Sequence, residues 1–524
     1  MNVAAIYSFI HTLWAVPSLV FSHTARVSPD ISHFAVHSLP NSSSLPTSWA
    51  GRLPVPQTPE GNSLFFWLFG AEDPAYDENL IIWFNGGPGC SSLIGLATGN
   101  GPVHFDGNST RLAQNPHSWT KLGHVLYVDQ PAGTGFSTAS IPYPVSDNDR
   151  VTSDFYRWLQ SFFTHFPNLR SKRVHLIGES WAGIYIPYFA SAIVNGQDAF
   201  PINLHSISIG DGTIGNPAAM STVTIGPYLR SQKNTLQIPD DVLAVFTEAD
   251  RACGFDEAMN AANQYPPNGT IHIPGDPENL NYKRHAKRKL GDFVNHTCNS
   301  EPATADAVRT AIFNSTCQGP CATFSTAADY MTTVSASGAG KPCHDVYDIH
   351  SDCSAIDPLN QLASYFSHAD VQNALNLRRP DDKSPPVSYS PCNSSTLTTL
   401  LSSTPPTPPA YHILPTLVTE NNISLHVYSG EYDMLLNHFG TELALQNMTW
   451  NGRQGFSRKP QPFYNNDAAP ARPCRDKETC AEAGIWASER GVTYHLFWGA
   501  GHTVFAKKAS EMFAYVRDVV AGTR

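Results

Sequence analysis

Short apolar runs, each followed by small or polar residues, recur along the chain. They occupy residues 80–84, 125–128, 174–177, 425–428 and 494–498. Runs of this length that stop at Gly, Asn or Asp are typical of strands buried on both faces. We therefore predict a sheet with strands at these positions.

Helical spacing appears between two of these runs and again at the end of the chain. Residues 151–166 carry Asp154 in their first turn and large apolar side chains at intervals of three and four, namely Phe155, Trp158, Leu159, Phe162 and Phe163. A second helix is predicted at 505–520. Strands that alternate with helices predict a mainly parallel central sheet flanked by helices.

A serine between two glycines follows the run 174–177, in the sequence Gly178-Glu179-Ser180-Trp181-Ala182-Gly183. A G-x-S-x-G motif between a strand and a helix is typical of the nucleophile elbow of an α/β-hydrolase. The glycines leave room for the helix to approach the strand, and the sharp turn exposes the serine hydroxyl. The motif predicts an α/β-hydrolase fold with Ser180 as nucleophile.

An acid and a histidine follow two later strands. Asp433 and His502 stand after Ser180 in the order usual for this fold. His502 would take the serine proton, and Asp433 would fix the histidine tautomer and stabilise its charged form. Asp129 also follows a predicted strand, but it precedes the serine, so chain order favours Asp433.

Two backbone N–H groups are expected to form an oxyanion hole. One belongs to Trp181, the residue after the nucleophile. The other is expected from the turn Asn85-Gly86-Gly87-Pro88-Gly89. We choose Gly87 because a glycine lets the backbone approach the reacting carbon closely.

Charge and cysteine spacing exclude other classes of protein. The formal net charge of -11 argues against a nucleic-acid partner, and no internal stretch is apolar for long enough to span a membrane. The cysteines lack the spacing of a zinc site, apart from Cys317 and Cys321, which no pair of histidines follows. We predict no metal and no cofactor, and we expect the scattered histidines at the surface.

Several features indicate the secretory pathway. Residues 3–21 are apolar and end among small or polar residues, which predicts a signal peptide over residues 1–22, although a positive leading region is missing. Ten cysteines indicate an oxidising compartment. Eight N-x-S/T sequons are glycosylation candidates, at Asn41, Asn108, Asn268, Asn295, Asn314, Asn393, Asn422 and Asn447.

Five blocks resemble the signature sequences of serine carboxypeptidases, and the segment 447–450 resembles fungal members. The blocks are residues 83–92, 115–119, 128–137, 178–183 and 499–502. The resemblance runs from about residue 60 to the C-terminus. It implies a secreted or vacuolar enzyme that releases C-terminal amino acids from peptides or proteins through an acyl-enzyme on Ser180.

The resemblance also assigns Asn85 and Glu179 to the substrate's C-terminal carboxylate. A carboxylate facing Glu179 can share a hydrogen bond only if one of the two carries a proton, so binding is expected to favour acidic pH. The resemblance pairs Cys90 with Cys392. Closeness in sequence makes Cys474 and Cys480 a second candidate disulfide, and the pairing of the other six cysteines stays open.

The chain departs from the family near the expected site. Gly99 stands where members commonly carry a second Glu, and Thr503-Val504-Phe505 replaces the usual Met-Val-Pro after the histidine. The missing Glu favours an alternative, an esterase or acyltransferase on the same scaffold. A non-catalytic binding or protective protein is a further alternative, against which the complete triad argues.

The predicted core consists of residues 55–215 and 361–524. Between them, residues 216–360 are rich in Cys, Pro, Gly and sequons and are interpreted as a disulfide-rich cap insertion over the active site. The basic run 283–289 within it is interpreted as a solvated loop. The alternative is a processing site that yields two chains held together by disulfides.

Overall fold

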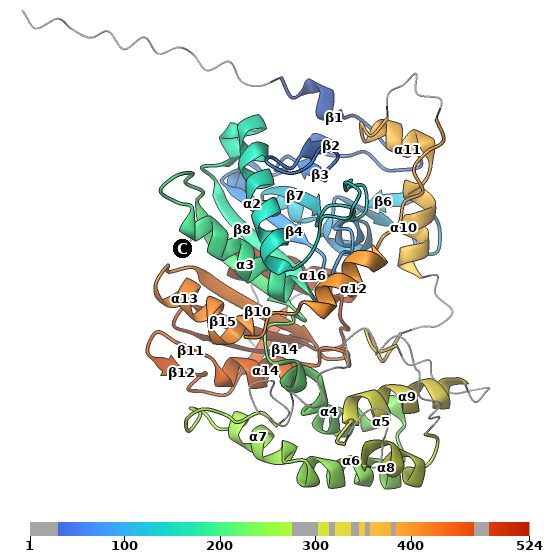
Figure 1. Ribbon diagram of the computed structural model, residues 1–524, viewed down its shortest axis with the longest axis vertical. Helices are drawn as coiled ribbons and strands as arrows, with labels where there is room; N and C mark the ends of the chain where they lie inside the picture. Colours follow the sequence, from blue (N-terminus) through green and yellow to red (C-terminus); the bar gives the residue numbers. More distant parts are fainter. Residues whose placement is uncertain are drawn as a thin grey trace, which may run out of the picture.

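The computed structural model describes residues 30–274, 302–313, 320–336, 345–351, 357–378, 384–465 and 481–522. Several sequence predictions lie outside these residues: the signal peptide, the basic run 283–289, Asn295, Asn314, Cys474 and Cys480. Figure 1 shows a large sheet covered by helices, with a smaller group of helices below it.

Eleven strands form one mixed sheet in the order β1-β2-β3-β7-β4-β8-β9-β10-β15-β14-β13. The central strands from β7 to β15 run parallel, and antiparallel strands extend both edges. The predicted mainly parallel sheet is confirmed. The strands are β1 Ala35–Val36, β2 Ser48–Pro54, β3 Ser63–Phe69, β4 Asn79–Phe84, β7 His124–Asp129, β8 Arg173–Glu179, β9 Leu204–Gly210, β10 Ser424–Gly430, β13 Gln461–Asn465, β14 Ala481–Glu489 and β15 Val492–Phe497.

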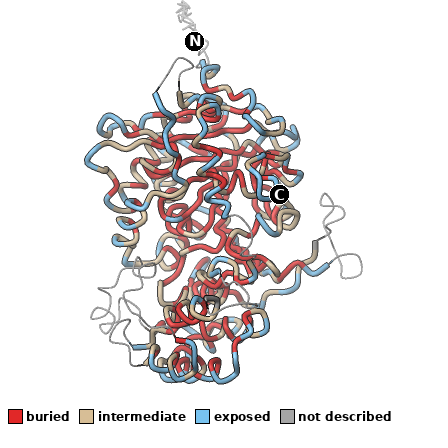
Figure 2. The backbone as a smooth tube through the Cα atoms, turned by 90° about the vertical axis from the view of Figure 1, so that its right-hand side faces the viewer, coloured by how far each residue is buried: buried red, intermediate tan, exposed pale blue. Residues whose placement is uncertain are grey.

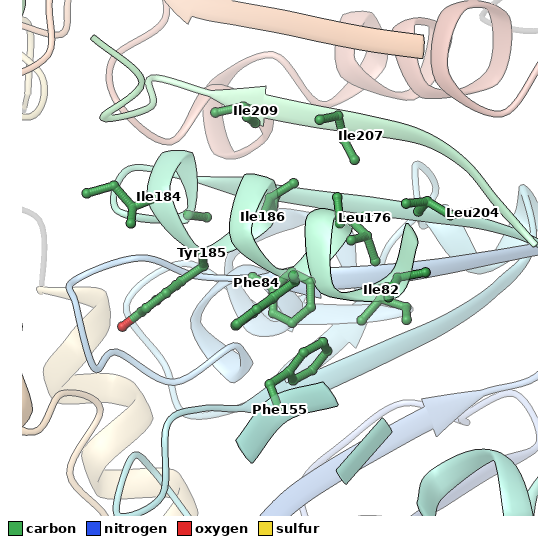
Figure 3. Packing of buried hydrophobic residues seen from close by; sticks show 14 of the residues in the cluster. Ile82, Phe84, Phe155, Leu176, Ile184, Tyr185, Ile186, Leu204, Ile207 and Ile209 are labelled. Atoms are coloured by element: carbon green, nitrogen blue, oxygen red, sulfur yellow. The ribbon is translucent and has the colours of Figure 1, made fainter. Parts of the chain in front are cut away.

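Both faces of the sheet are covered, which explains the continuous apolar runs. In β4, Ile82 and Phe84 point to one hydrophobic cluster while Ile81 and Trp83 point to another. Helices α2 (Asn148–His165), α3 (Ala182–Asn195) and α13 (Ile413–Thr419) contribute to the first cluster. Figure 3 shows Phe155 of α2 beside Phe84 and the apolar side chains of α3 lying over the strands.

The second cluster includes the helices at the end of the chain, α15 (Val504–Lys507) and α16 (Ala509–Tyr515), followed by the π-helical turn η10 (Val516–Val520). The single helix predicted at 505–520 is therefore wrong in detail. Lys508 between α15 and α16 has φ −122° and ψ 50°, outside the helical region. Neither Gly nor Pro marks this break in the sequence.

Helices between β9 and β10 form a separate packed group. Its members α4 (Ile225–Ser231), α6 (Asp240–Ala252), α8 (Ala305–Phe313) and α9 (Thr323–Ala336) share one hydrophobic cluster. Figure 2 shows its buried interior below that of the sheet. A disulfide between Cys253 and Cys321 joins two segments of this group. The boundaries 216 and 360 of the insertion stay a prediction.

The remaining elements connect these layers or lie at their edges. They are α1 Leu93–Gly95, α5 Lys233–Leu236, α7 Phe255–Ala262, α10 Pro358–Phe366, α11 Ala369–Ala374, α12 Ser394–Ser402, α14 His438–Asn447, β5 Val103–Phe105, β6 Leu112–Gln114, β11 Thr449–Trp450 and β12 Arg453–Gln454. Across the described ranges, no helix combines the length and apolar character that a membrane crossing requires.

Four buried histidines, His438 and three on strands of the sheet, contradict the expectation that the scattered histidines lie at the surface. His175, His426 and His495 belong to β8, β10 and β15 and are buried. Nδ1 of His175 lies 2.7 Å from Ser206 Oγ, and Nδ1 of His426 lies 2.9 Å from Thr493 Oγ1. Hydroxyl partners on neighbouring strands therefore allow neutral imidazoles to lie within the sheet.

Candidate active site

Ser180 forms the turn between β8 and α3, with φ 64° in the left-handed region. Backbone hydrogen bonds hold this strained conformation: its N–H donates to Gly210 O at 2.9 Å, and its carbonyl accepts from Gly183 N at 2.9 Å and Thr213 N at 3.1 Å. The turn is thus fastened to the end of β9, and its geometry is that of a nucleophile elbow.

Both glycines of the elbow lie in close contact with neighbouring backbone. A Cβ on Gly178 would overlap the carbonyl oxygen of Phe84, and a Cβ on Gly183 would lie 2.5 Å from Thr213 N. Any larger residue at either position would push α3 away from the sheet. The close approach of helix and strand expected from these two glycines is therefore present.

Asp433 and His502 meet beyond the ends of β10 and β15. Nδ1 of His502 lies 2.6 Å from Asp433 Oδ2, and both residues are buried. Asp433 Oδ1 accepts a bond from Leu436 N at 3.1 Å. The Ser180 hydroxyl makes no hydrogen bond to His502 in this structure; in enzymes without substrate this contact is often long.

Nearby carboxyl groups determine the pKa of His502. Burial disfavours the charged ring, but the charge and hydrogen bond of Asp433, together with the charges of Glu179 and Asp345, outweigh burial and raise the pKa of His502. The imidazolium that forms when His502 accepts a proton is therefore stabilised.

Asp129, the alternative candidate for the triad acid, forms its hydrogen bonds with other residues than His502. Its carboxylate accepts hydrogen bonds from Ser91 Oγ at 2.6 Å, Ser92 N at 3.0 Å and Phe136 N at 2.9 Å. Burial raises its pKa to about 6. Asp129 thus organises the loops after β4 and β7, while Asp433 holds the histidine.

The glycine-rich turn after β4 lies directly against the elbow. A Cβ on Gly86 would overlap the backbone N of Trp181. In the part of the chain that the structure describes, neither the N–H of Gly87 nor that of Trp181 has a hydrogen-bond acceptor. Both donors are therefore free for a developing oxyanion.

The same turn is anchored to a distant segment. Cys90 and Cys392 form a disulfide, the pair that the family resemblance implies. Ser91 N donates to Pro391 O at 2.7 Å, and Asn393 N donates to Gly89 O at 2.9 Å. These bonds fix the turn against the loop before α12.

Asn85 and Glu179 are hydrogen-bonded next to the nucleophile. Asn85 Nδ2 donates to Glu179 Oε1 at 2.8 Å. Asn85 Oδ1 accepts from Trp83 Nε1 at 2.8 Å and Gly95 N at 2.9 Å, so the amide orientation is fixed.

The second oxygen of Glu179, Oε2, is buried and has no partner among the described residues. Burial, helped by the charge of Asp433, raises the pKa of Glu179 to about 7, although His502 and the Asn85 bond lower it. The side chain is protonated in acidic solution and then has an unused donor.

Gly99 is closely packed against Phe505. A Cβ on residue 99 would lie 2.9 Å from the Phe505 carbonyl oxygen and 3.0 Å from its Cδ2. The two departures from the family pattern thus contact each other. The structure leaves no room for an acid at position 99 while Phe505 keeps this place.

Sequence reasoning missed two residues at this site. Tyr347 accepts the backbone N–H of His502 at 2.7 Å, and its ring lies 5.1 Å from the imidazole. It comes from the predicted insertion, and no sequence signal marked it. Asp211 directly follows the strand β9 and lies next to Asp433. The rule that selected Asp433, a polar residue after a strand, also applies to Asp211.

In the described ranges, no group of three His, Cys, Asp or Glu side chains converges as metal ligands.

An elbow serine and an acid–histidine pair on an α/β sheet define the class of serine hydrolases. The sequence profile described as "Serine carboxypeptidase" matches residues 44–522. The chain belongs to the serine carboxypeptidase family, and it is a hydrolase of that type.

Individual relatives agree with this assignment. The chain is 44% identical over 525 residues to a carboxypeptidase Y homolog of Arthroderma benhamiae, covering 99% of each chain. It is 30% identical over 469 residues to the pheromone-processing carboxypeptidase kex1 of Talaromyces stipitatus, covering 87% of this chain and 63% of that one.

A solved structure shares the fold. The crystal structure of Kex1Δp, a prohormone-processing carboxypeptidase from Saccharomyces cerevisiae, superimposes with a TM-score of 0.67 at 23% identity. The match covers 93% of this chain and 95% of the other.

Proposed function

We propose that this serine carboxypeptidase releases C-terminal amino acids from peptides or proteins through an acyl-enzyme on Ser180. Ser180 Oγ attacks the last peptide carbonyl while His502 takes its proton, and Asp433 stabilises the imidazolium. The N–H groups of Gly87 and Trp181 bind the oxyanion. His502 then donates the proton to the leaving amine, and water hydrolyses the acyl-enzyme by the reverse sequence of proton transfers.

The observation that carries exopeptidase specificity is the Asn85–Glu179 bond. Asn85 orients Glu179 and leaves Oε2 without a partner beside the nucleophile. A proton on Oε2 would be donated to the substrate's terminal carboxylate, a charge-assisted hydrogen bond in a buried place. A peptide with an amidated C-terminus, or with further residues after the position that binds here, has no carboxylate at this place and cannot make this contact.

The raised pKa of Glu179 supports activity in acidic solution. Below about pH 7 Glu179 is protonated and can bind an anion. Its protonation also removes one of the charges that raise the pKa of His502, which extends the range in which the base is neutral towards lower pH. This coupling favours the acidic pH range expected from the sequence.

Matched peptides test this function. A peptide with a free C-terminus and its amidated twin are incubated with the wild type and with Ser180→Ala, and released amino acids are measured. Only the free acid is expected to be cleaved, and only by the wild type. A fluorophosphonate probe should label the wild type and not the Ser180→Ala variant. Equal cleavage of both peptides would contradict carboxylate recognition.

The second candidate function is an esterase or acyltransferase. The contact of Gly99 with Phe505 favours it, because no second acid can support Glu179. In that case an ester with no free carboxylate would be hydrolysed far faster than any peptide, or its acyl group would pass to an added alcohol in preference to water.

A secretory location is the remaining part of the proposal. The disulfides Cys90–Cys392 and Cys253–Cys321 support an oxidising compartment. Secretion and vacuolar delivery are distinguished by assaying the culture medium and isolated vacuoles of the native source.

A further inference from the structure

Asp211 connects the end of β9 to the strand that carries the triad acid. Its backbone N–H donates to Tyr428 O at 2.9 Å, and its Oδ1 accepts from Gly430 N at 2.9 Å. The residue is fully buried and has φ 41°, in the left-handed region, which Asp and Asn adopt more readily than most residues other than Gly. These bonds fix the Asp211 carboxyl where β10 ends and the Asp433 loop begins.

Asp433 lies close enough to Asp211 to act on its carboxyl group through charge and as a side-chain hydrogen-bond partner. Oδ2 of Asp211 receives no hydrogen bond from any donor in the described part of the chain. The other titratable groups that act on Asp211 are Glu179 from β8, Tyr428 from β10 and Tyr494 from β15. No Lys or Arg of the described ranges is among them.

Two ionised carboxylates in contact would repel each other strongly in a buried site, so one of them holds a proton. Asp433 receives the Nδ1–H of His502 at 2.6 Å, which favours its charged form. The proton therefore belongs on Asp211. Burial, followed by the charge of Asp433, raises the pKa of Asp211 well above its usual value.

We propose that Asp211 is a positioning residue of the triad, which stays protonated and donates its O–H to the Asp433 carboxylate. The donated bond restrains Asp433 towards His502. It also moderates the basicity of Asp433, and thereby the proton affinity of His502, without adding a negative charge. This inference rests on the proposed role of Asp433 as the triad acid.

The test compares Asp211→Ala, which removes the donor, with Asp211→Asn, which keeps a donor of similar shape in an uncharged group. The readout is the pH profile of kcat/KM for an ester, since ester hydrolysis does not need the carboxylate contact of Glu179. Thermal unfolding of each variant shows that it is folded.

Asp211→Ala is expected to lower kcat/KM by at least about 10-fold. It should also move the acidic limb to higher pH, because an Asp433 without the donor binds the His502 proton more tightly. Asp211→Asn is expected to recover most of the rate and to leave the acidic limb within about 0.3 pH unit of the wild type.

Two results would overturn the proposal. If Asp211 were ionised, Asp211→Asn would remove a negative charge and move the acidic limb to lower pH. If Asp211 were only structural, both variants would lose rate equally with unchanged pH profiles. Asp211→Asn alone decides between these outcomes if Asp211→Ala does not fold. Loss of all activity in Ser180→Ala tests the triad independently, so the two failures are distinguishable.

Discussion

Phe505 fills the space beside Gly99. Its ring is buried, with its centroid 5.1 Å from that of Trp83 and 6.1 Å from that of Trp119. A Cβ on residue 99 would meet the Phe505 backbone as well as its ring. The pair therefore occupies the place of the family's second acid, and among the described residues Asn85 is the hydrogen-bond partner that orients Glu179.

Gly99→Ala is expected to lower the free energy of unfolding by about 1–3 kcal/mol, because the added methyl overpacks a site whose neighbour is backbone. Chemical denaturation measures the effect. Gly70→Ala is the matched control, since a Cβ there would lie at ordinary contact distance, 3.5 Å from Thr47 O. Equal stability of Gly99→Ala and the wild type would show that Phe505 moves away freely.

Glu179→Gln is expected to raise KM for a free-acid peptide by roughly 10-fold in acidic solution, where the wild-type carboxyl donates its proton to the substrate. Above about pH 7 the wild-type side chain ionises and repels the substrate, whereas Gln still donates. The difference between the enzymes should therefore shrink or reverse. KM values across this pH range measure it, with an ester as control; an equal rise at every pH would contradict the contact.

Acid is expected to destabilise the protein through His495. Burial lowers its pKa from 6.5 to about 3. The neutral form is therefore favoured by folding, and this stabilisation is complete above pH 6.5 and is lost as the pH falls towards 3. The loss amounts to at most about 1.4 kcal/mol per pH unit.

His495→Phe removes this titration while keeping a ring beside Trp486. Urea unfolding between pH 4 and 6.5 should show a shallower pH dependence for this variant than for the wild type. His33→Gln changes an exposed histidine and is the control. An identical slope in all three proteins would exclude His495 as a cause.

Glycans are expected at the exposed asparagines Asn41, Asn108, Asn268 and Asn422, and not at Asn393 or Asn447. Asn393 Nδ2 donates to Gly133 O at 2.8 Å, and Asn447 Nδ2 donates to Ile271 O at 3.0 Å. A glycan would replace one of the two hydrogens on either nitrogen and place a sugar beside a side chain that is already held against a backbone carbonyl. Peptide mapping after deglycosylation in heavy-oxygen water gives the modified positions, and a glycan at Asn393 or Asn447 would contradict this prediction.

Local sequence patterns predicted the central strands and the elbow because those signals depend on neighbours in the chain. The run before Ser180 and its flanking glycines specify a strand, a tight turn and a close helix without reference to other segments. The acid and histidine followed from the same rule applied to later strands. The structure adds the 2.6 Å contact between Asp433 and His502.

The features that could not be predicted from the sequence depend on contacts between residues that are far apart in the chain. The burial of His495 follows from the strands on either side of β15, and periodicity does not identify them. The position of Tyr347 against His502 follows from how the insertion folds back, and it has no local signal. Asp211 follows a strand as Asp433 does, but this local pattern does not show that the two residues lie together.

The Cys90–Cys392 disulfide closes a covalent ring that contains Ser180 and every residue of the predicted insertion. Cleavage of one peptide bond within the ring opens it but releases no fragment. Ser180 would stay linked to Asp433 and His502, which lie beyond residue 392. The topology of the chain thus permits a single cut between residues 90 and 392 without separating the nucleophile from its base.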